Sequence, residues 1–118
     1  MSAPTAQEQY QLELINHTRI DPMGNAARYI TSYSPLLSSN SAIQIALNFF
    51  GVSGTDLLAA FQALVPAQPV AWNSNLNDAA TLHSAAMIAA DQQSHQLPGE
   101  ASLGDRLKNA GYNFTAGA

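Results

Sequence analysis

The chain has 118 residues, a length typical of one domain, and only 10% of them are charged, against roughly 25% in an average protein. Its net charge is −4, and its basic residues, Arg19, Arg28, Arg106 and Lys108, are scattered along the sequence. Nucleic acids and anionic membrane surfaces are bound through clustered basic side chains, so the composition argues against both partners. The lack of cysteine excludes disulfides, thiol catalysis and cysteine-ligated zinc.

The first part of the chain predicts two helices. A T-x-x-E capping box at Thr5 precedes an apolar pattern of helical period that we expect to end near Ile20. Asp21 is placed to cap a second, short helix with Pro22 at its first position. This second helix is expected to fade at residues 32–35.

Residues 36–65 predict an extra pair of helices in the most apolar part of the chain. The first has cap candidates at residues 39–41 and a stop at Gly51, and the second opens at Ser53 or Thr55. Two interpretations stay open, a packed helical hairpin and a surface that binds a partner or lipid. No apolar run reaches 18 residues, so we expect no membrane-spanning helix.

The remainder predicts one short strand and two more helices. The strand is PVAW, residues 69–72, and a long alanine-rich helix follows over 75–92 with Asn73 or Ser74 as its cap. Ser102 is expected to cap the last helix, LGDRLKNA. The sequence therefore predicts a mostly α fold.

Three stretches together indicate a family. They are QYQLELINHTRIDPMGNAARY, QPVAWNSNLNDAATLHSAAMIAADQQSH and LGDRLKNAGYNF. In this order they resemble a bacterial CAP/SCP-like domain (cysteine-rich secretory proteins, antigen 5 and pathogenesis-related proteins), over residues 5–30 and 69–118. Of the family's His-Asn-x-x-Arg motif only Asn16 and Arg19 match, and we expect these two to tie the first helix to the end of the domain.

The resemblance implies an α-β-α sandwich that is usually secreted, so it implies an extracellular location, although MSAPTAQEQY is not a signal peptide by its pattern. Its groove carries two histidines and two acidic residues, which bind a divalent ion in some members. The first groove histidine maps onto His95. The Gly-Glu-Asn motif of the first acid would begin near Ala118, so residues 1–118 are expected to be one domain corresponding to the helical N-terminal half, with most strands missing.

Three residues are the groove candidates: His95, His83 and Glu100. His95 follows the long helix in a loop and is the candidate ligand of a divalent metal ion such as zinc. His83 shares an apolar stripe with Met87, which favours a hydrogen-bonded structural role over a ligand role by about three to one. The two histidines are twelve positions apart, whereas zinc ligands on one helix are typically about four apart, so further ligands would come from elsewhere.

Three functional hypotheses follow. The leading one is a non-enzymatic, secreted-type binding domain in which His95 forms one wall of the groove. The second is a metal-assisted peptidase or esterase, in which a bound ion activates water and residues beyond 118 complete the site. The third is a structural helical module that associates with its own C-terminal half or with a second copy. A small apolar ligand is a further candidate partner.

Overall fold

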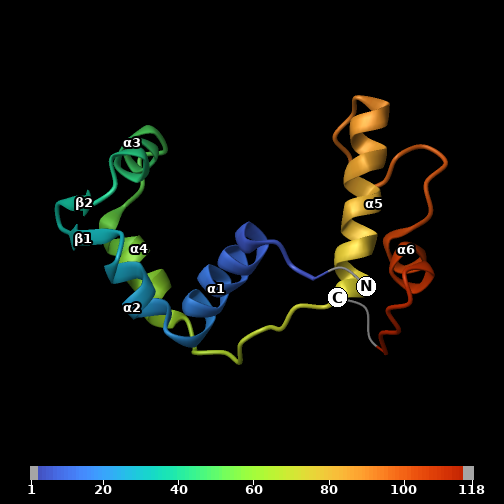
Figure 1. Cartoon of the computed structure of the whole chain (residues 1–118). Coiled ribbons are helices and arrows are strands. Elements are labelled where there is room, and N and C mark those ends of the chain that lie inside the picture. The colour runs from blue at the N-terminus through green and yellow to red at the C-terminus, as the bar shows by residue number, and fades with distance from the viewer. Residues whose placement is uncertain (1–2, 116–118) are drawn as a thin grey trace. The chain divides into compact units, whose positions relative to one another are not determined.

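The computed structural model describes residues 3–115, which form six helices and one two-stranded sheet (Figure 1). The expectation of a mostly helical chain is confirmed, whereas the α-β-α sandwich stays a prediction. The elements are α1 (Ala6–Ile20), α2 (Pro22–Ala27), β1 (Ile30–Tyr33), β2 (Leu36–Ser38), α3 (Ser41–Phe49), α4 (Gly54–Ala63), α5 (Ser74–Ala90) and α6 (Leu103–Asn109).

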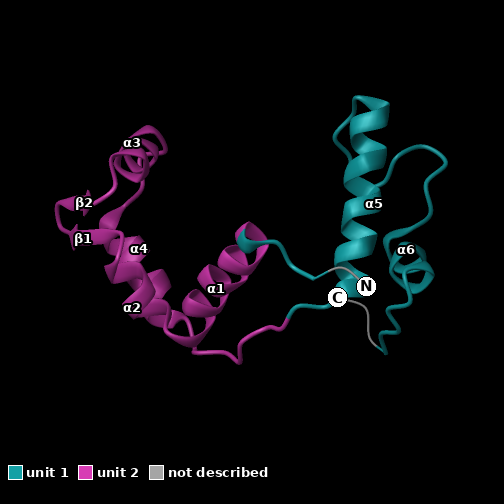
Figure 2. Ribbon diagram, viewed as in Figure 1, with its two compact units in different colours: residues 1–6, 72–118 teal, residues 7–71 magenta. Residues whose placement is uncertain are grey.

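The chain divides into two compact units (Figure 2). Unit 2 is Gln7–Ala71, and unit 1 is made of residues 1–6 and 72–118. The single domain predicted over 1–118 stays a prediction, and its ends, residues 1–2 and 116–118, lie outside the described part.

In unit 2, α2 begins as the sequence predicts. The Asp21 carboxylate accepts a 2.9 Å hydrogen bond from the Gly24 N–H, and Pro22 occupies the first turn, where no backbone donor is needed. The helix ends at Ala27, and the chain then turns into a strand.

The antiparallel hairpin of β1 and β2 is a feature that the sequence reading missed. Ile30 pairs with Ser38 and Tyr33 with Leu36, around a turn that contains a cis Ser34–Pro35 peptide bond. Strands of four and three residues are too short to display a convincing alternation of apolar and polar side chains.

Both helices of the region 36–65 begin at polar caps. Asn40 accepts hydrogen bonds from two backbone N–H groups at the start of α3, and Ser53 accepts one at the start of α4. Gly51, with a φ of +58°, ends the first helix in the left-handed region that glycine adopts at little cost. In this unit α4 packs against α2 and β1.

The strand predicted at residues 69–72 is wrong. The backbone N–H and C=O of Val70 are hydrogen-bonded to the Asn16 side chain of α1, at 2.7 and 2.9 Å, instead of to a neighbouring strand. Arg19 adds a 2.8 Å hydrogen bond from Nε to the Gln68 carbonyl. Asn16 and Arg19 thus tie α1 to the extended segment 67–70.

In unit 1, α5 is capped by Asn73 at its start and by Asp91 after its last residue, and Asp91 is a non-glycine residue in the left-handed region with a φ of 48°. The Ser102 hydroxyl caps α6, and Gly111 follows the end of that helix at a φ of +88°. Asn75 donates a hydrogen bond to the Gly111 carbonyl at 3.1 Å, which joins the start of α5 to the end of α6.

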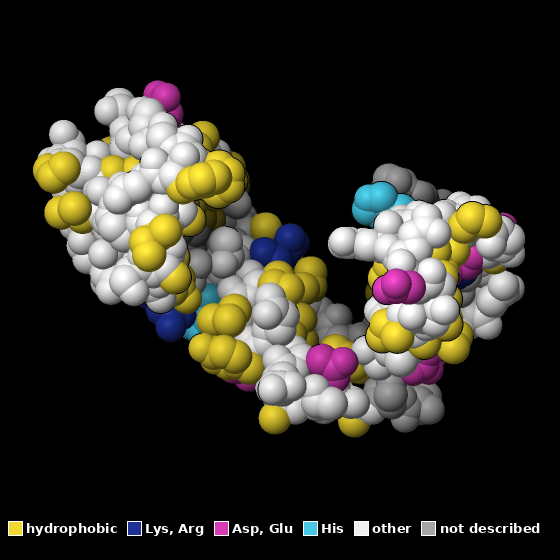
Figure 3. Space-filling model, turned by 90° about the horizontal axis from the view of Figure 1, so that it is seen from above, with side chains coloured by type: hydrophobic (Ala, Val, Ile, Leu, Met, Phe, Trp, Pro, Cys, Tyr) yellow, Lys and Arg dark blue, Asp and Glu magenta, His cyan; other side chains and the backbone are white. Residues whose placement is uncertain are grey.

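Little apolar surface is buried within residues 3–115. The buried hydrophobic residues are Ala26, Ile30, Ala79 and Leu97, while many larger apolar side chains are exposed (Figure 3). No single described helix is long and apolar enough to cross a membrane, in agreement with the sequence; α3 and α4 have sufficient apolar length only together, and they are bent by 109°.

Candidate functional site

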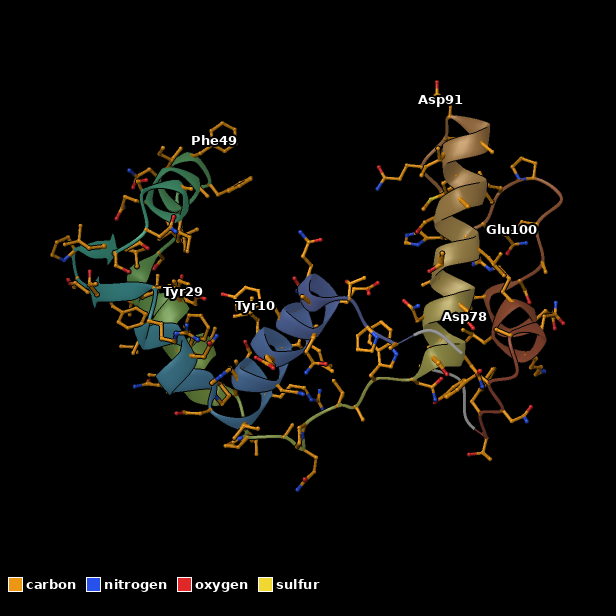
Figure 4. All side chains as sticks on the ribbon, in the orientation of Figure 1. Tyr10, Tyr29, Phe49, Asp78, Asp91 and Glu100 are labelled. Atoms are coloured by element: carbon orange, nitrogen blue, oxygen red, sulfur yellow. The ribbon has the colours of Figure 1, made fainter. Side chains whose placement is uncertain are left out.

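The three residues that the sequence singled out all lie in unit 1. His83 is on α5, and His95 and Glu100 are on the segment between α5 and α6, residues 91–102, which we call the 91–102 loop. Glu100 lies between the two helices (Figure 4). Arg106, on α6, joins them and was not a predicted site residue.

Glu100 is the centre of a charged cluster with His83 and Arg106. Its Oε1 lies 2.7 Å from His83 Nδ1 and accepts a 2.8 Å hydrogen bond from Arg106 Nη1, and Oε2 accepts a 2.9 Å bond from the Leu97 N–H. The three cluster side chains are between 13% and 19% exposed. The Leu97 hydrogen bond, opposed by desolvation and assisted by His83 and Arg106, lowers the pKa of Glu100 from 4.5 to about 2.

His83 uses both ring nitrogens within this cluster. Nε2 lies 2.9 Å from the Ser94 carbonyl oxygen, and Nδ1 contacts both Glu100 and the Arg106 guanidinium. A ring protonated on both nitrogens can donate to both oxygens, whereas a neutral ring donates to Ser94 and accepts from Arg106. In either form neither nitrogen is free for a metal ion, because each already has a partner.

Arg106 holds the loop in place from α6. Its guanidinium contacts Glu100 and also the backbone of His95. Nη2 donates a 2.8 Å hydrogen bond to the His95 carbonyl. The Nε–H is buried without a hydrogen-bond partner. The sequence carried one signal for Arg106 as a site residue. It is one of only four basic residues in the chain, and it follows the candidate Glu100 by six positions.

His95 has a fixed backbone and an exposed side chain. It borders a pocket together with His83, Met87, Gln93 and Ser94. His95 thus lies in a loop, as the sequence predicts, and its imidazole is accessible to a ligand at the edge of the pocket.

A second pocket of unit 1 lies between α5 and α6. Its volume is about 250 Å³, and its lining combines the apolar Ala79 and Leu82 with His83, Glu100 and Arg106. The cluster therefore borders two concave surfaces, one of them shared with His95.

The described residues fit a metal ion poorly on their own. Among residues 3–115, no three histidine, aspartate or glutamate side chains lie close enough together to hold one. The Arg106 cation beside Glu100 also opposes a second positive charge there. His95 is the one groove candidate whose ring has no hydrogen bond among the described contacts, so a metal site would need ligands from outside this cluster.

No protein-family model, curated protein or solved structure matches this chain. The CAP/SCP resemblance accordingly rests on the three sequence stretches alone.

Proposed function

We propose that this chain belongs to an extracellular, non-enzymatic binding domain of the CAP/SCP kind, with the 91–102 loop as its binding element. The observation that carries the proposal is the Arg106 guanidinium, which bridges the Glu100 carboxylate and the His95 carbonyl. The extracellular location and the family are inferred from the sequence resemblance.

The bridge supports a binding role because it fixes the backbone beneath an exposed side chain. Ser94 and Glu100 attach the loop to His83 of α5, and Arg106 attaches it to α6. A loop held at these points loses little conformational entropy when it binds a ligand, which is the physical advantage of preorganisation. His95 is therefore an exposed side chain on an ordered backbone, able to bind a ligand.

The first ligand to test is a divalent ion that His95 shares with residues outside the cluster. Isothermal titration of the chain with zinc is expected to show weak binding, because one imidazole supplies one of the three or four ligands of a zinc site. His95→Ala should abolish the heat signal, and His17→Ala, which removes another exposed histidine from α1, should keep it. Equal binding by the wild type and His95→Ala would remove the ion proposal.

A second candidate function is association through the apolar surface of α5. Leu82 and Ile88 of this helix are largely exposed, and Ala79 is its one buried described residue. The strands that the family resemblance implies, or a second copy, would cover such a surface. Light scattering should then give a dimer, or a complex with a longer form of the domain; a well-folded monomer that unfolds cooperatively would count against this function.

The hydrolase and the small apolar ligand remain alternatives. A hydrolase needs a bound ion that activates water. Residues beyond 118 would have to supply its acids and its second histidine, because both nitrogens of His83 are engaged. The apolar ligand has one supporting feature, the pocket walled by Ala79 and Leu82. Hydrolysis of peptides or esters by the purified chain, lost in His95→Ala, would favour the hydrolase.

A further inference from the structure

The turn between α3 and α4 carries an exposed apolar cluster that the proposed function does not use. We call it the aromatic tip and define it by Ile45, Phe49, Phe50 and Val52. Ile45 is 69% exposed, Phe49 81% and Phe50 75%. The two phenylalanine rings meet edge to face with centroids 5.0 Å apart, and the Phe49 ring projects away from the ribbon (Figure 4). Large aromatic side chains this exposed need a physical explanation.

Backbone hydrogen bonds hold the turn in its shape. The Gly51 N–H donates to the Asn48 carbonyl at 3.2 Å, and the Val52 N–H donates to the Leu47 carbonyl at 3.1 Å. Ser53 then caps α4 directly. The tip is thus an ordered end of the helical pair with its aromatic side chains turned outward.

The other end of α3 is anchored to the hairpin. The Gln44 side chain accepts a 2.8 Å hydrogen bond from the Ser38 N–H and donates one of 3.3 Å to the Leu36 carbonyl. With this anchor, the helix cannot turn its aromatic end inward without breaking bonds to β2. The contacts that place α3 therefore also set the direction in which its aromatic end points.

The charge of the segment indicates which surface the tip fits. Between Ser41 and Val65 the only charged residue is Asp56, and no lysine or arginine is present. Anionic lipid headgroups and acidic proteins attract basic residues, so neither is favoured here. An uncharged apolar tip matches the interface of an electrically neutral bilayer, where binding strength follows the apolar area inserted.

Insertion into lipid demands less of the tip than a dimer interface does. Two phenylalanines, one isoleucine and one partly exposed valine offer on the order of 500 Å² of apolar surface. A stable protein interface adds a polar rim to such a patch, to roughly 800 Å² from each partner, and needs a matching shape on the other side. Shallow insertion into lipid requires no complementary protein surface. Together α3 and α4 have the apolar length and composition of a membrane segment, but they are bent by 109°, which does not suit a straight crossing.

We propose that the aromatic tip inserts into the interfacial region of neutral lipid bilayers and so attaches this protein to a membrane surface. The inference is independent of the 91–102 loop, because every residue that carries it lies in unit 2. Membrane attachment through the tip would leave the loop chemistry unchanged.

Flotation of the full chain with phosphatidylcholine vesicles tests the proposal. The wild type should float with the vesicles, with no gain from added phosphatidylglycerol and little loss at high salt. The variant Phe49→Ser/Phe50→Ser should reduce the floated fraction at least about tenfold, since both rings would lose their transfer to the apolar phase. The control Tyr10→Ser/Leu103→Ser removes two exposed apolar residues of α1 and α6, which are 61% and 62% exposed, and should float like the wild type.

A second measurement reports insertion directly and does not depend on removing apolar residues. Phe50→Trp adds a tryptophan at the tip, and its fluorescence should be quenched by phosphatidylcholine brominated along the acyl chains, beyond the quenching of Trp72 in the wild type. Failure of the wild type to float, equal flotation of both double variants, or no added quenching would overturn the proposal. So would a lipid-free dimer that Phe49→Ser/Phe50→Ser dissociates, because the occupant would then be a second copy.

Discussion

The Asn16 side chain forms a reciprocal pair of hydrogen bonds with the backbone of Val70. Its Nδ2 donates to the Val70 carbonyl at 2.9 Å, and its Oδ1 accepts from the Val70 N–H at 2.7 Å. An amide side chain of α1 thus satisfies both backbone groups of a residue 54 positions away, as a neighbouring strand would.

We predict that Asn16→Ala destabilises the protein by about 1–2 kcal/mol, because two hydrogen bonds are lost and the Val70 backbone groups must find water instead. Urea unfolding followed by circular dichroism measures the change. Gln11→Ala, an exposed substitution on the same helix, should stay within about 0.5 kcal/mol of the wild type. An unchanged midpoint for Asn16→Ala would show that the pair contributes nothing to stability.

The helix starts could be predicted from the sequence because cap chemistry is local. An oxygen-bearing side chain and the N–H groups it accepts from lie within three residues of each other, so the pattern is visible without the fold. The caps of this kind at predicted positions are Asp21, Asn40, Ser53, Asn73 and Ser102.

The hairpin and the charged cluster could not be predicted in the same way. Arg106 meets His83 across 23 residues, and the fold, not spacing along one helix, brings these side chains together. The strand misassigned at residues 69–72 has the same cause, since a side chain from α1 takes the place of a strand partner. Glu100 and His83 were both candidates, but the sequence carried no sign that they touch.

Gly54 packs directly against the hairpin. A Cβ atom there would lie 1.9 Å from the Tyr33 carbonyl oxygen and 3.3 Å from the Leu36 side chain, so alanine forces α4 away from β1. We predict that Gly54→Ala costs about 1–3 kcal/mol despite the better helix propensity of alanine. Thermal unfolding is the measurement, with Thr55→Ala at the adjacent exposed position as the control. A melting temperature equal to or above that of the wild type would contradict the predicted clash.

Arg106 is predicted to order the 91–102 loop. Arg106→Lys keeps the charge but loses the planar fork that reaches both Glu100 and the His95 carbonyl. Amide hydrogen exchange in the loop should then rise about tenfold, the equivalent of one net hydrogen bond, while the centre of α5 keeps its protection. Lys108→Arg, on the same helix, provides the control. Unchanged exchange in the loop would remove the bridge as the basis of the proposed function.

The low pKa of Glu100 predicts an acid-sensitive contribution to stability. Its pKa is about 2 in the folded protein against 4.5 ordinarily, because the Leu97 N–H, His83 and Arg106 stabilise the carboxylate. The contribution is complete above pH 4.5 and is lost as the pH falls toward 2, since the unfolded chain takes up the proton first. Glu100→Gln should therefore melt below the wild type at pH 7, and the gap should close between pH 4.5 and 2. Glu13→Gln on α1, whose carboxylate accepts a 3.3 Å hydrogen bond from Gln9, should show a much smaller gap. A Glu100→Gln gap that does not change with pH would mean that lost packing, not the charge, is responsible.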